Sequence, residues 1–377
     1  MKVIIAPDAF KGSLTADEAA NAMQIGIQEI FPEAETVCLP VADGGEGTLS
    51  ALVSATSGAY KTFIVRDPLG RPIEAQLGIL GDGETAVVEL AQASGLTLLA
   101  PDELNPMRTS TYGTGELIRH ALDIGFRKLI IGLGGSATND GGTGLLEALG
   151  VSFFDNEGRL LQMNGASLLQ IDKVDMSHLD PRVKATDIRI ASDVENPFIG
   201  EKGASYIFGP QKGADAQSVK LLDKGMRYFA DETEHLTGVR LHELRGAGAA
   251  GGSAGALIAY CDARLESGID VVLEAMNFST HLPSADIIFT GEGKTDLQTL
   301  DGKALMGVAR LAKSYQVPVF VISGAIEEGA RIQLDEWFTE LHALDDGSQT
   351  LAELMTNASE LLSLKTEILM KTFEQSS

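Results

Sequence analysis

The 377-residue chain has few of the residues that mark several protein classes. Its two cysteines, Cys38 and Cys261, cannot form a disulfide framework, and its six histidines lack the spacing of a zinc site. No apolar run is long enough to span a bilayer, and the brief apolar start at 3–6 is more typical of a buried strand than of a signal peptide. We therefore expect a cytoplasmic protein with ordinary thiols.

Positive charge is also scarce. The chain has 29 Lys and Arg against 53 Asp and Glu, a formal net charge of −24 at pH 7. A field of this sign repels nucleic acid and anionic lipid, so we expect neither as a partner. An anionic substrate would have to be held by local lysines, backbone N–H groups or a metal ion.

The chain does contain short apolar runs that alternate with helical patterns at both of its ends, which is typical of βαβ units. Its middle differs, because residues 61–80 alternate in period two around a turn and indicate a hairpin. We predict an α/β fold with a doubly wound, mostly parallel Rossmann-like domain (1–60 and 275–377) and an inserted second α/β domain (61–274). The active site is expected in the cleft between them.

Carboxylates lie in loops that follow five predicted strands. Since the carboxyl ends of parallel strands share one edge of a sheet, we expect most of these side chains around one crevice. They are Asp8, Asp43, Glu46, Asp140, Asp193, Glu195, Glu292 and Asp296.

The longest glycine-rich loop, 132–144, is not a Walker A loop, because no Gly-Lys-Ser/Thr follows. It does contain the dinucleotide pattern G-x-G-x-x-A at 132–137, and Asp155 mimics the acid that binds a ribose. Against that interpretation, residues 139–144 would interrupt the helix that should begin at the pyrophosphate. We favour a phosphate or substrate loop.

Lysines accompany the acids and glycines in the same loops. The candidates are Lys11, Lys212, Lys294 and Lys303. Glycines let backbone N–H groups approach phosphate closely, while carboxylates hold Mg²⁺ or accept a hydroxyl proton. This combination indicates phosphoryl transfer to an alcohol.

Six segments in unbroken order, 6–14, 40–48, 134–142, 193–197, 208–214 and 290–293, resemble the type 1 family of bacterial glycerate kinases. The resemblance implies a two-domain α/β enzyme that transfers phosphate from ATP to D-glycerate with Mg²⁺. The branch to which it is most similar makes 2-phosphoglycerate, within glyoxylate or sugar-acid breakdown. The resemblance covers residues 2–325, and the last fifty residues carry little of it.

The roles of single residues are our own hypotheses. The catalytic set has Asp193 as the base, Asp43 as the second choice, and Lys212 as the cation that stabilises the moving phosphoryl group. Expected substrate ligands are Asp8, Lys11, Asp43, Glu46 and Asp140. Expected ATP ligands are Gly134, Gly135, Ser136, Thr138, Gly291, Gly293 and Lys294. Expected Mg²⁺ ligands are Glu292 and Asp296.

Three alternatives remain open at this point. The enzyme could phosphorylate the 3-hydroxyl of glycerate, since one cleft reaches both hydroxyls. It could instead be an NAD(P)-dependent hydroxy-acid dehydrogenase, or a non-catalytic acid-binding protein. The sequence also leaves open the nucleotide preference and whether two copies form a homodimer.

Overall fold

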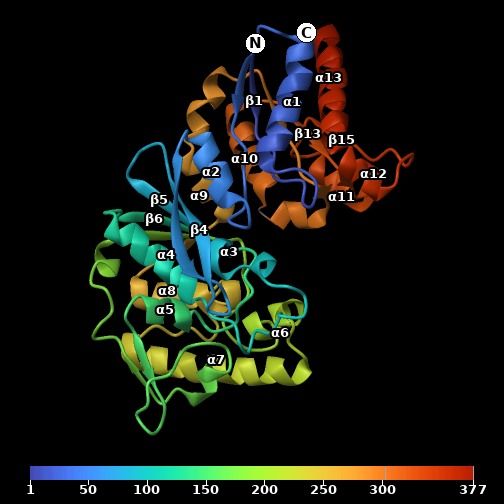
Figure 1. The fold of residues 1–377 in the computed structure, drawn as a ribbon. Coiled ribbons are helices and arrows are strands. Elements are labelled where there is room, and N and C mark those ends of the chain that lie inside the picture. Colours follow the sequence, from blue (N-terminus) through green and yellow to red (C-terminus); the bar gives the residue numbers. More distant parts are fainter. Residues whose placement is uncertain (302, 377) are drawn as a thin grey trace. The chain divides into compact units, whose positions relative to one another are not determined.

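The computed structural model describes residues 1–301 and 303–376 (Figure 1). Its contacts divide the chain into two compact units. Unit 1 consists of Met1–Asp43, Ser50–Ser57 and Ser267–Ser377, and unit 2 consists of Gly44–Leu49 and Gly58–Glu266. Both chain ends thus belong to unit 1, and the middle of the chain is inserted as a second α/β unit. The short segment Gly44–Leu49 clusters with unit 2, although the sequence analysis placed it in the first domain.

Unit 1 is built on a five-stranded parallel sheet in the order β15-β13-β11-β1-β2. This is a doubly wound order of the flavodoxin type, and the direction of winding reverses between β1 and β11. The prediction of a doubly wound parallel sheet is confirmed. The strands are β1 (Lys2–Ile5), β2 (Glu35–Cys38), β11 (Ile287–Thr290), β13 (Val319–Ser323) and β15 (Glu340–Ala343), with a separate parallel pair β12 (Lys294–Thr295) and β14 (Ala325–Ile326).

The helices of unit 1 are α1 (Ala16–Ile30), α9 (Gly268–Ala275), α10 (Ala304–Tyr315), α11 (Glu328–Leu334), α12 (Leu351–Thr356) and α13 (Ala358–Ser376). Helix α2 (Thr48–Ala55) begins in unit 2 and continues in unit 1. Short 3₁₀ turns cover Phe278–Thr280, Leu282–Ser284 and Leu297–Asp301.

Capping boxes start two of these helices. At α1, Glu18 N donates to Thr15 Oγ1 over 3.2 Å, and Thr15 N donates to Glu18 Oε2 over 2.8 Å. Thr350 and Glu353 repeat this arrangement at α12. The C-terminal segment forms two successive helices, because α12 ends before Asn357 and α13 begins after it.

Unit 2 contains a six-stranded sheet in the order β10-β9-β6-β5-β4-β3. Four strands run parallel, and the predicted hairpin is confirmed as the antiparallel pair β3–β4. The strands are β3 (Ala59–Arg66), β4 (Pro72–Ile79), β5 (Thr85–Glu89), β6 (Lys128–Gly132), β9 (Asp187–Ala191) and β10 (Arg264–Glu266), with a small separate pair β7 (Ser152–Phe154) and β8 (Lys173–Asp175).

Its helices are α3 (Ala91–Ser94), α4 (Tyr112–Asp123), α5 (Thr143–Ala148), α6 (Ala204–Phe208), α7 (Ala216–Thr237) and α8 (Ser253–Cys261). The 3₁₀ turns are Leu96–Leu98, Ser167–Gln170, Val183–Ala185, Pro210–Lys212 and Ala249–Gly252. A stacked pair of rings, Phe229 and Tyr260, lies in its core, with centroids 6.0 Å apart. No helix among the described residues is long and apolar enough to cross a membrane.

Packing between the first and last helices generates a prediction about stability. A Cβ on Gly26 of α1 would lie 2.2 Å from the carbonyl oxygen of Ser363 on α13. We expect Gly26→Ala to lower the free energy of unfolding by about 1–3 kcal/mol, because overpacking forces the helices apart. Urea unfolding of the whole chain measures the change.

Gly329 of α11 supplies the matched control, since a Cβ there would meet no atom within 4 Å. Gly329→Ala should raise the free energy of unfolding by about 0.5–1 kcal/mol through helix propensity alone. Equal effects of the two alanines would contradict the packing argument.

Candidate functional site

Two loops meet where the winding of the unit 1 sheet reverses. One follows β1 and carries Asp8, and the other follows β11 and carries Glu292. They are tied together by two hydrogen bonds, from Asp8 N to Gly291 O over 2.8 Å and from Thr290 Oγ1 to Ala6 O over 2.7 Å. This is the position at which doubly wound sheets bind their ligands.

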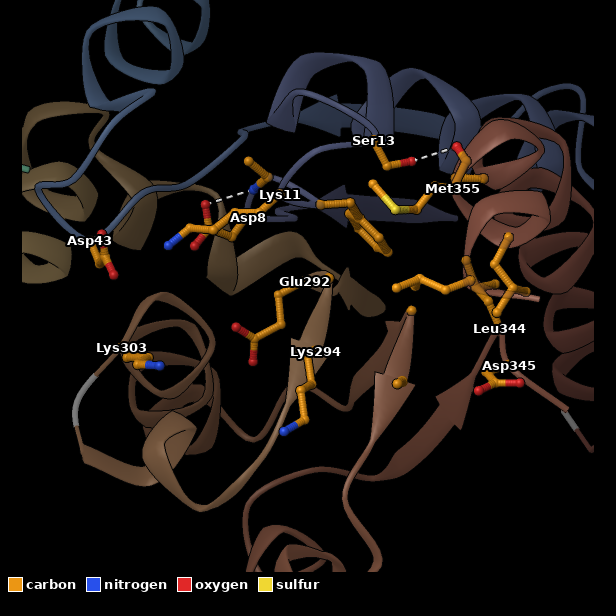
Figure 2. Close-up of a pocket in the computed structure, with 18 residues that line it drawn as sticks. Asp8, Lys11, Ser13, Asp43, Glu292, Lys294, Lys303, Leu344, Asp345 and Met355 are labelled. Atoms are coloured by element: carbon orange, nitrogen blue, oxygen red, sulfur yellow. Dashed lines mark hydrogen bonds between the residues drawn. The ribbon is translucent and has the colours of Figure 1, made fainter. Parts of the chain in front are cut away.

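A cavity of about 560 Å³ opens at these loops (Figure 2). Six of the predicted site residues line it: Asp8, Lys11, Asp43, Glu292, Gly293 and Lys294. Lys303 and Asp345 add further charge, and Phe10, Leu344, Leu351, Leu354, Met355 and Ala358 add apolar surface. Substrate, nucleotide and metal candidates that lie far apart in the sequence therefore share one cavity within unit 1.

Two predicted residues near this cavity are not among its lining residues. Gly291 fills a packing position, because a Cβ on it would lie 1.9 Å from Ile322 O. The Asp296 carboxylate lies 3.4 Å from Lys294 Nζ and accepts a hydrogen bond from Gln298 N. Gly291 thus shapes the loop through its backbone, while Asp296 acts on the cavity through Lys294.

Burial and nearby negative charge disfavour the ionisation of Asp8 and Glu292. Burial raises the pKa of Asp8 to about 7, and the negative charges of Asp43 and Glu292 add to this, while Lys11 and a 2.6 Å hydrogen bond from Ala9 N oppose it. Burial also raises the pKa of Glu292, against hydrogen bonds from Thr299 and Thr295. A bound cation would relieve this repulsion.

The donor set fits Mg²⁺ of the kind that phosphates help to hold. Asp8 and Glu292 supply carboxylate oxygens beside three lysines. Among residues 1–301 and 303–376, no group of three or more acidic, histidine or cysteine side chains could hold a metal alone. Mg²⁺ commonly uses one or two carboxylates, water and substrate phosphates, so this arrangement suits it.

In unit 2, a second set of loops lies at the carboxyl ends of β5, β6 and β9. The segment Gly44–Leu49 packs against the glycine-rich loop, where Leu133 N and Gly134 N donate to Gly44 O over 3.1 and 3.3 Å. A Cβ on Gly134 would lie 2.3 Å from the Cα of Gly45. This contact needs glycine at position 134, which explains part of the composition of the loop.

Glu89, at the end of β5, was missed by the sequence analysis. It is 3 % exposed, and its Oε2 accepts hydrogen bonds from Gly47 N over 3.2 Å and from Leu49 N over 2.9 Å. It thereby fixes the loop that carries Glu46, which is itself exposed. The available signal was an acid at the end of a strand, as at the other candidates.

Lys212 supports the glycine-rich loop from within unit 2. It is 1 % exposed, and its ammonium donates to Ser136 Oγ over 2.7 Å and to the carbonyl of Thr138 over 2.6 Å. Burial lowers its pKa to about 7, while the charge of Asp140 opposes the shift. In this geometry the lysine positions the loop, and Gly135 is exposed at its tip.

Asp140 requires a correction, because it is not placed to bind substrate. It is 0 % exposed and accepts hydrogen bonds from Thr111 N, Thr111 Oγ1, Gly142 N and Gly144 N. Thr111 directly precedes α4, Gly142 directly precedes α5, and Gly144 lies in the first turn of α5. Asp140 therefore joins the starts of two helices, which is a structural role.

Asp193 follows β9 and is half-buried in unit 2. The candidates thus form two groups, with Asp43 and Glu292 in unit 1 and Asp140 and Asp193 in unit 2. Each group lies at the carboxyl ends of the strands of its own sheet.

The loop geometry also bears on the dinucleotide alternative. Helix α5 begins only at Thr143, after Gly142 at φ 75°, so no helix starts at 132–137. Asp155, the mimic of a ribose-binding acid, pairs with Arg159 at 2.8 Å. The loop therefore lacks the helix N-terminus on which a pyrophosphate would lie.

Comparison with known proteins identifies the family. The profile of the glycerate kinase family matches residues 3–374. The chain belongs to the glycerate kinase family. It is 47 % identical to glycerate kinase of Bacillus subtilis (strain 168), over 96 % of this chain and 95 % of that protein. It is 46 % identical to glycerate 2-kinase of Escherichia coli (strain K12), over 87 % of this chain and 86 % of that protein.

A glycerate kinase 2 crystal structure from Salmonella typhimurium LT2 matches with a TM-score of 0.89 at 41 % identity. The match covers 100 % of this chain and 99 % of that one, so it supports the two-unit α/β fold. As a glycerate kinase, the chain is a phosphotransferase with an alcohol acceptor, and its family implies ATP as the phosphate donor. The resemblance noted in the sequence is confirmed.

The crowded carboxylates generate a pH prediction for this glycerate kinase. The pKa of Asp8 is about 7 in the folded protein against an ordinary 3.8, so the folded state keeps a proton that the unfolded chain loses. The contribution of Asp8 to the free energy of unfolding therefore falls as pH rises from about 4 to 7, and it stays low above pH 7. At pH 8 without metal, Asp8→Asn should raise the free energy of unfolding on the order of 1–2 kcal/mol.

Urea unfolding at pH 5 and pH 8 in EDTA measures the effect. The amide oxygen of the introduced asparagine still accepts from Ala9 N, so loss of charge is the main change. The gain should shrink markedly at pH 5, where the wild-type group is protonated in the folded state. A gain of the same size at both pH values would show that charge is not its cause.

Proposed function

We propose that this enzyme phosphorylates D-glycerate on its 2-hydroxyl, with ATP as donor and Mg²⁺ as the metal. The observation that carries the proposal is the cavity at the winding reversal of unit 1, where Lys11, Lys294 and Lys303 lie among the carboxylates of Asp8 and Glu292. Lysines bind the anionic groups of both substrates, and the carboxylates suit a metal and a hydroxyl. The name of the Escherichia coli relative supports the 2-position.

Within this proposal, Lys11 neutralises the carboxylate of glycerate, while Asp8, Asp43 and Glu46 bind its hydroxyls. Lys11 and Asp43 line the cavity with Asp8, and Glu46 is exposed on the adjoining loop. Because a small acid offers few contacts, one ion pair and two or three hydrogen bonds must orient it. Orientation is the main source of rate in phosphoryl transfer.

The phosphates of ATP are assigned to two glycine-containing loops. In unit 1 these are the backbone around Gly291 and Gly293 together with the Lys294 ammonium, which is largely exposed. In unit 2 the loop contributes Gly134, Gly135, Ser136 and Thr138, with Lys212 buried beneath it. Lys212 then acts on the moving phosphoryl group through the loop that it positions.

Glu292 would hold Mg²⁺ directly, and Asp296 would do so through water. When bound, the metal neutralises charge that develops on the transferred phosphoryl group. Glu292 is already oriented, since its Oε1 accepts from both Thr295 Oγ1 and Thr299 Oγ1.

For the proton of the attacking hydroxyl we assign Asp193 as acceptor, with Asp43 as the second choice. Both follow strands at the carboxyl edges of their sheets. The structure adds Asp8 as a third candidate, because its pKa of about 7 is that of an effective base near neutral pH.

Phosphorus NMR of the product tests the reaction and its position together. D-Glycerate, ATP and Mg²⁺ incubated with the whole chain should give ADP and the doublet of a secondary phosphate ester, as in authentic 2-phosphoglycerate. The triplet of 3-phosphoglycerate would overturn the regiochemistry. Absence of any phosphate ester with D-glycerate would overturn the substrate.

Amide substitutions distinguish the candidate bases. We expect Asp193→Asn to lower kcat by about 10²–10⁴ while ATP still binds, because a general base contributes that much. Asp43→Asn and Asp8→Asn are compared in parallel by steady-state kinetics. Asp262→Asn, an exposed surface change at 67 % side-chain exposure, is the control and should leave kcat unchanged. If Asp193→Asn is as active as this control, the assignment moves to whichever of the other two loses kcat.

A further inference from the structure

The unit 1 cavity has two chemically different ends. Figure 2 shows Asp8, Asp43, Glu292 and Lys303 on one side, Leu344 and Met355 with the carboxylate of Asp345 on the other, and Lys294 between them. The apolar end, defined here as Phe10, Leu344, Leu351, Leu354, Met355 and Ala358, comes largely from α12 and its flanks. Glycerate has no apolar face, so nothing in the acceptor accounts for this end.

The apolar end is held in place by contacts between α12 and the loop that follows β1. Ser13 Oγ donates to Met355 O over 2.8 Å, and a Cβ on Gly12 would lie 2.9 Å from Met355 Cε. The capping box of Thr350 and Glu353 fixes the start of α12. The loop that carries Lys11 is thus hydrogen-bonded to the helix that supplies the apolar side chains.

The exposure of the apolar side chains and the size of the cavity indicate room for a ligand larger than glycerate. Leu351 is 72 % exposed although it lines a cavity, and Leu354 and Met355 are half-buried. The cavity of about 560 Å³ falls in the range of roughly 300–1,000 Å³ that takes drug-sized ligands, which is far more than a three-carbon acid fills. A ligand with one flat apolar part and one strongly anionic part matches both ends.

We propose that the apolar end binds the purine base of ATP and that Lys294 and Lys303 receive its phosphates. This inference rests on the proposed function and adds the position of the base. The base packs against Leu351, Leu354 and Met355, where a methionine sulfur also makes favourable contacts with aromatic rings. The triphosphate then extends along Lys294 toward Asp8 and Glu292.

The test separates the base from the phosphates by comparing two probes. Calorimetry measures the affinity of the whole chain for ATP and for inorganic tripolyphosphate, both with Mg²⁺. The variant is Leu351→Ser with Leu354→Ser, and the matched control is Leu364→Ser on α13, which is 50 % exposed and outside the cavity. The Leu351→Ser/Leu354→Ser variant should have an affinity for ATP lower by about tenfold or more. Its affinity for tripolyphosphate should be unchanged.

Lys294→Gln should weaken both probes, because it removes charge that both of them meet. The position of the base is overturned if Leu351→Ser/Leu354→Ser binds ATP as tightly as Leu364→Ser does. It is also overturned if the leucine variant loses affinity for both probes to the same extent. A third contrary outcome is a wild type that sediments as a dimer and a leucine variant that sediments as a monomer, because a second copy of the chain would then cover the leucines.

Failure of this inference is distinguishable from failure of the proposed function. If the wild type makes 2-phosphoglycerate and the leucine variant keeps its ATP affinity, the function stands and the base lies elsewhere. If the wild type prefers ATP over tripolyphosphate through these leucines but phosphorylates no glycerate, the base position stands and the acceptor is wrong.

Discussion

The pairing of β1 with β11 is the constraint on which the rest of unit 1 depends. Only this pairing brings the loop after Ile5 beside the loop after Thr290, and the bond from Thr290 Oγ1 to Ala6 O spans 284 residues. Once the strands are in register, Asp8 and Glu292 must lie at the same edge of the sheet. Their proximity, which adds to the effect of burial in raising the pKa of Asp8, follows directly from that register. The sheet therefore determines the chemistry of the cavity before any ligand arrives.

Much of this arrangement could be predicted because strand ends carry information that is local. A buried apolar run followed within a few residues by an acid identified the loops of Asp8, Asp43, Asp193 and Glu292 without any knowledge of contacts. The capping box of α1 is local in the same way, since Thr15 and Glu18 are only three residues apart. The parallel, doubly wound architecture followed from the alternation of strands and helices at both ends of the chain.

What could not be predicted is whether a polar side chain faces a ligand or its own fold. Asp140 and Asp8 look alike in the sequence, yet four internal donors enclose the first, whereas the second lines the cavity. Lys212 and Lys294 differ in the same way, because Lys212 is buried beneath the glycine-rich loop, whereas Lys294 is largely exposed. The apolar end was missed because α12 resembles any amphipathic packing helix. These distinctions depend on tertiary contacts that no local pattern encodes.

The interleaved order of the two units has a consequence for synthesis on the ribosome. Nearly all of unit 2, Gly58–Glu266, emerges before β11, β13 and β15 exist. Until β11 appears, β1 has β2 on one side and an open edge on the other. The inserted unit can thus form its core during translation. Meanwhile β1 and β2 remain only partly paired, and the open edge of β1 can aggregate or bind a chaperone. Completion of the unit 1 cavity is accordingly among the last steps in folding of the nascent chain.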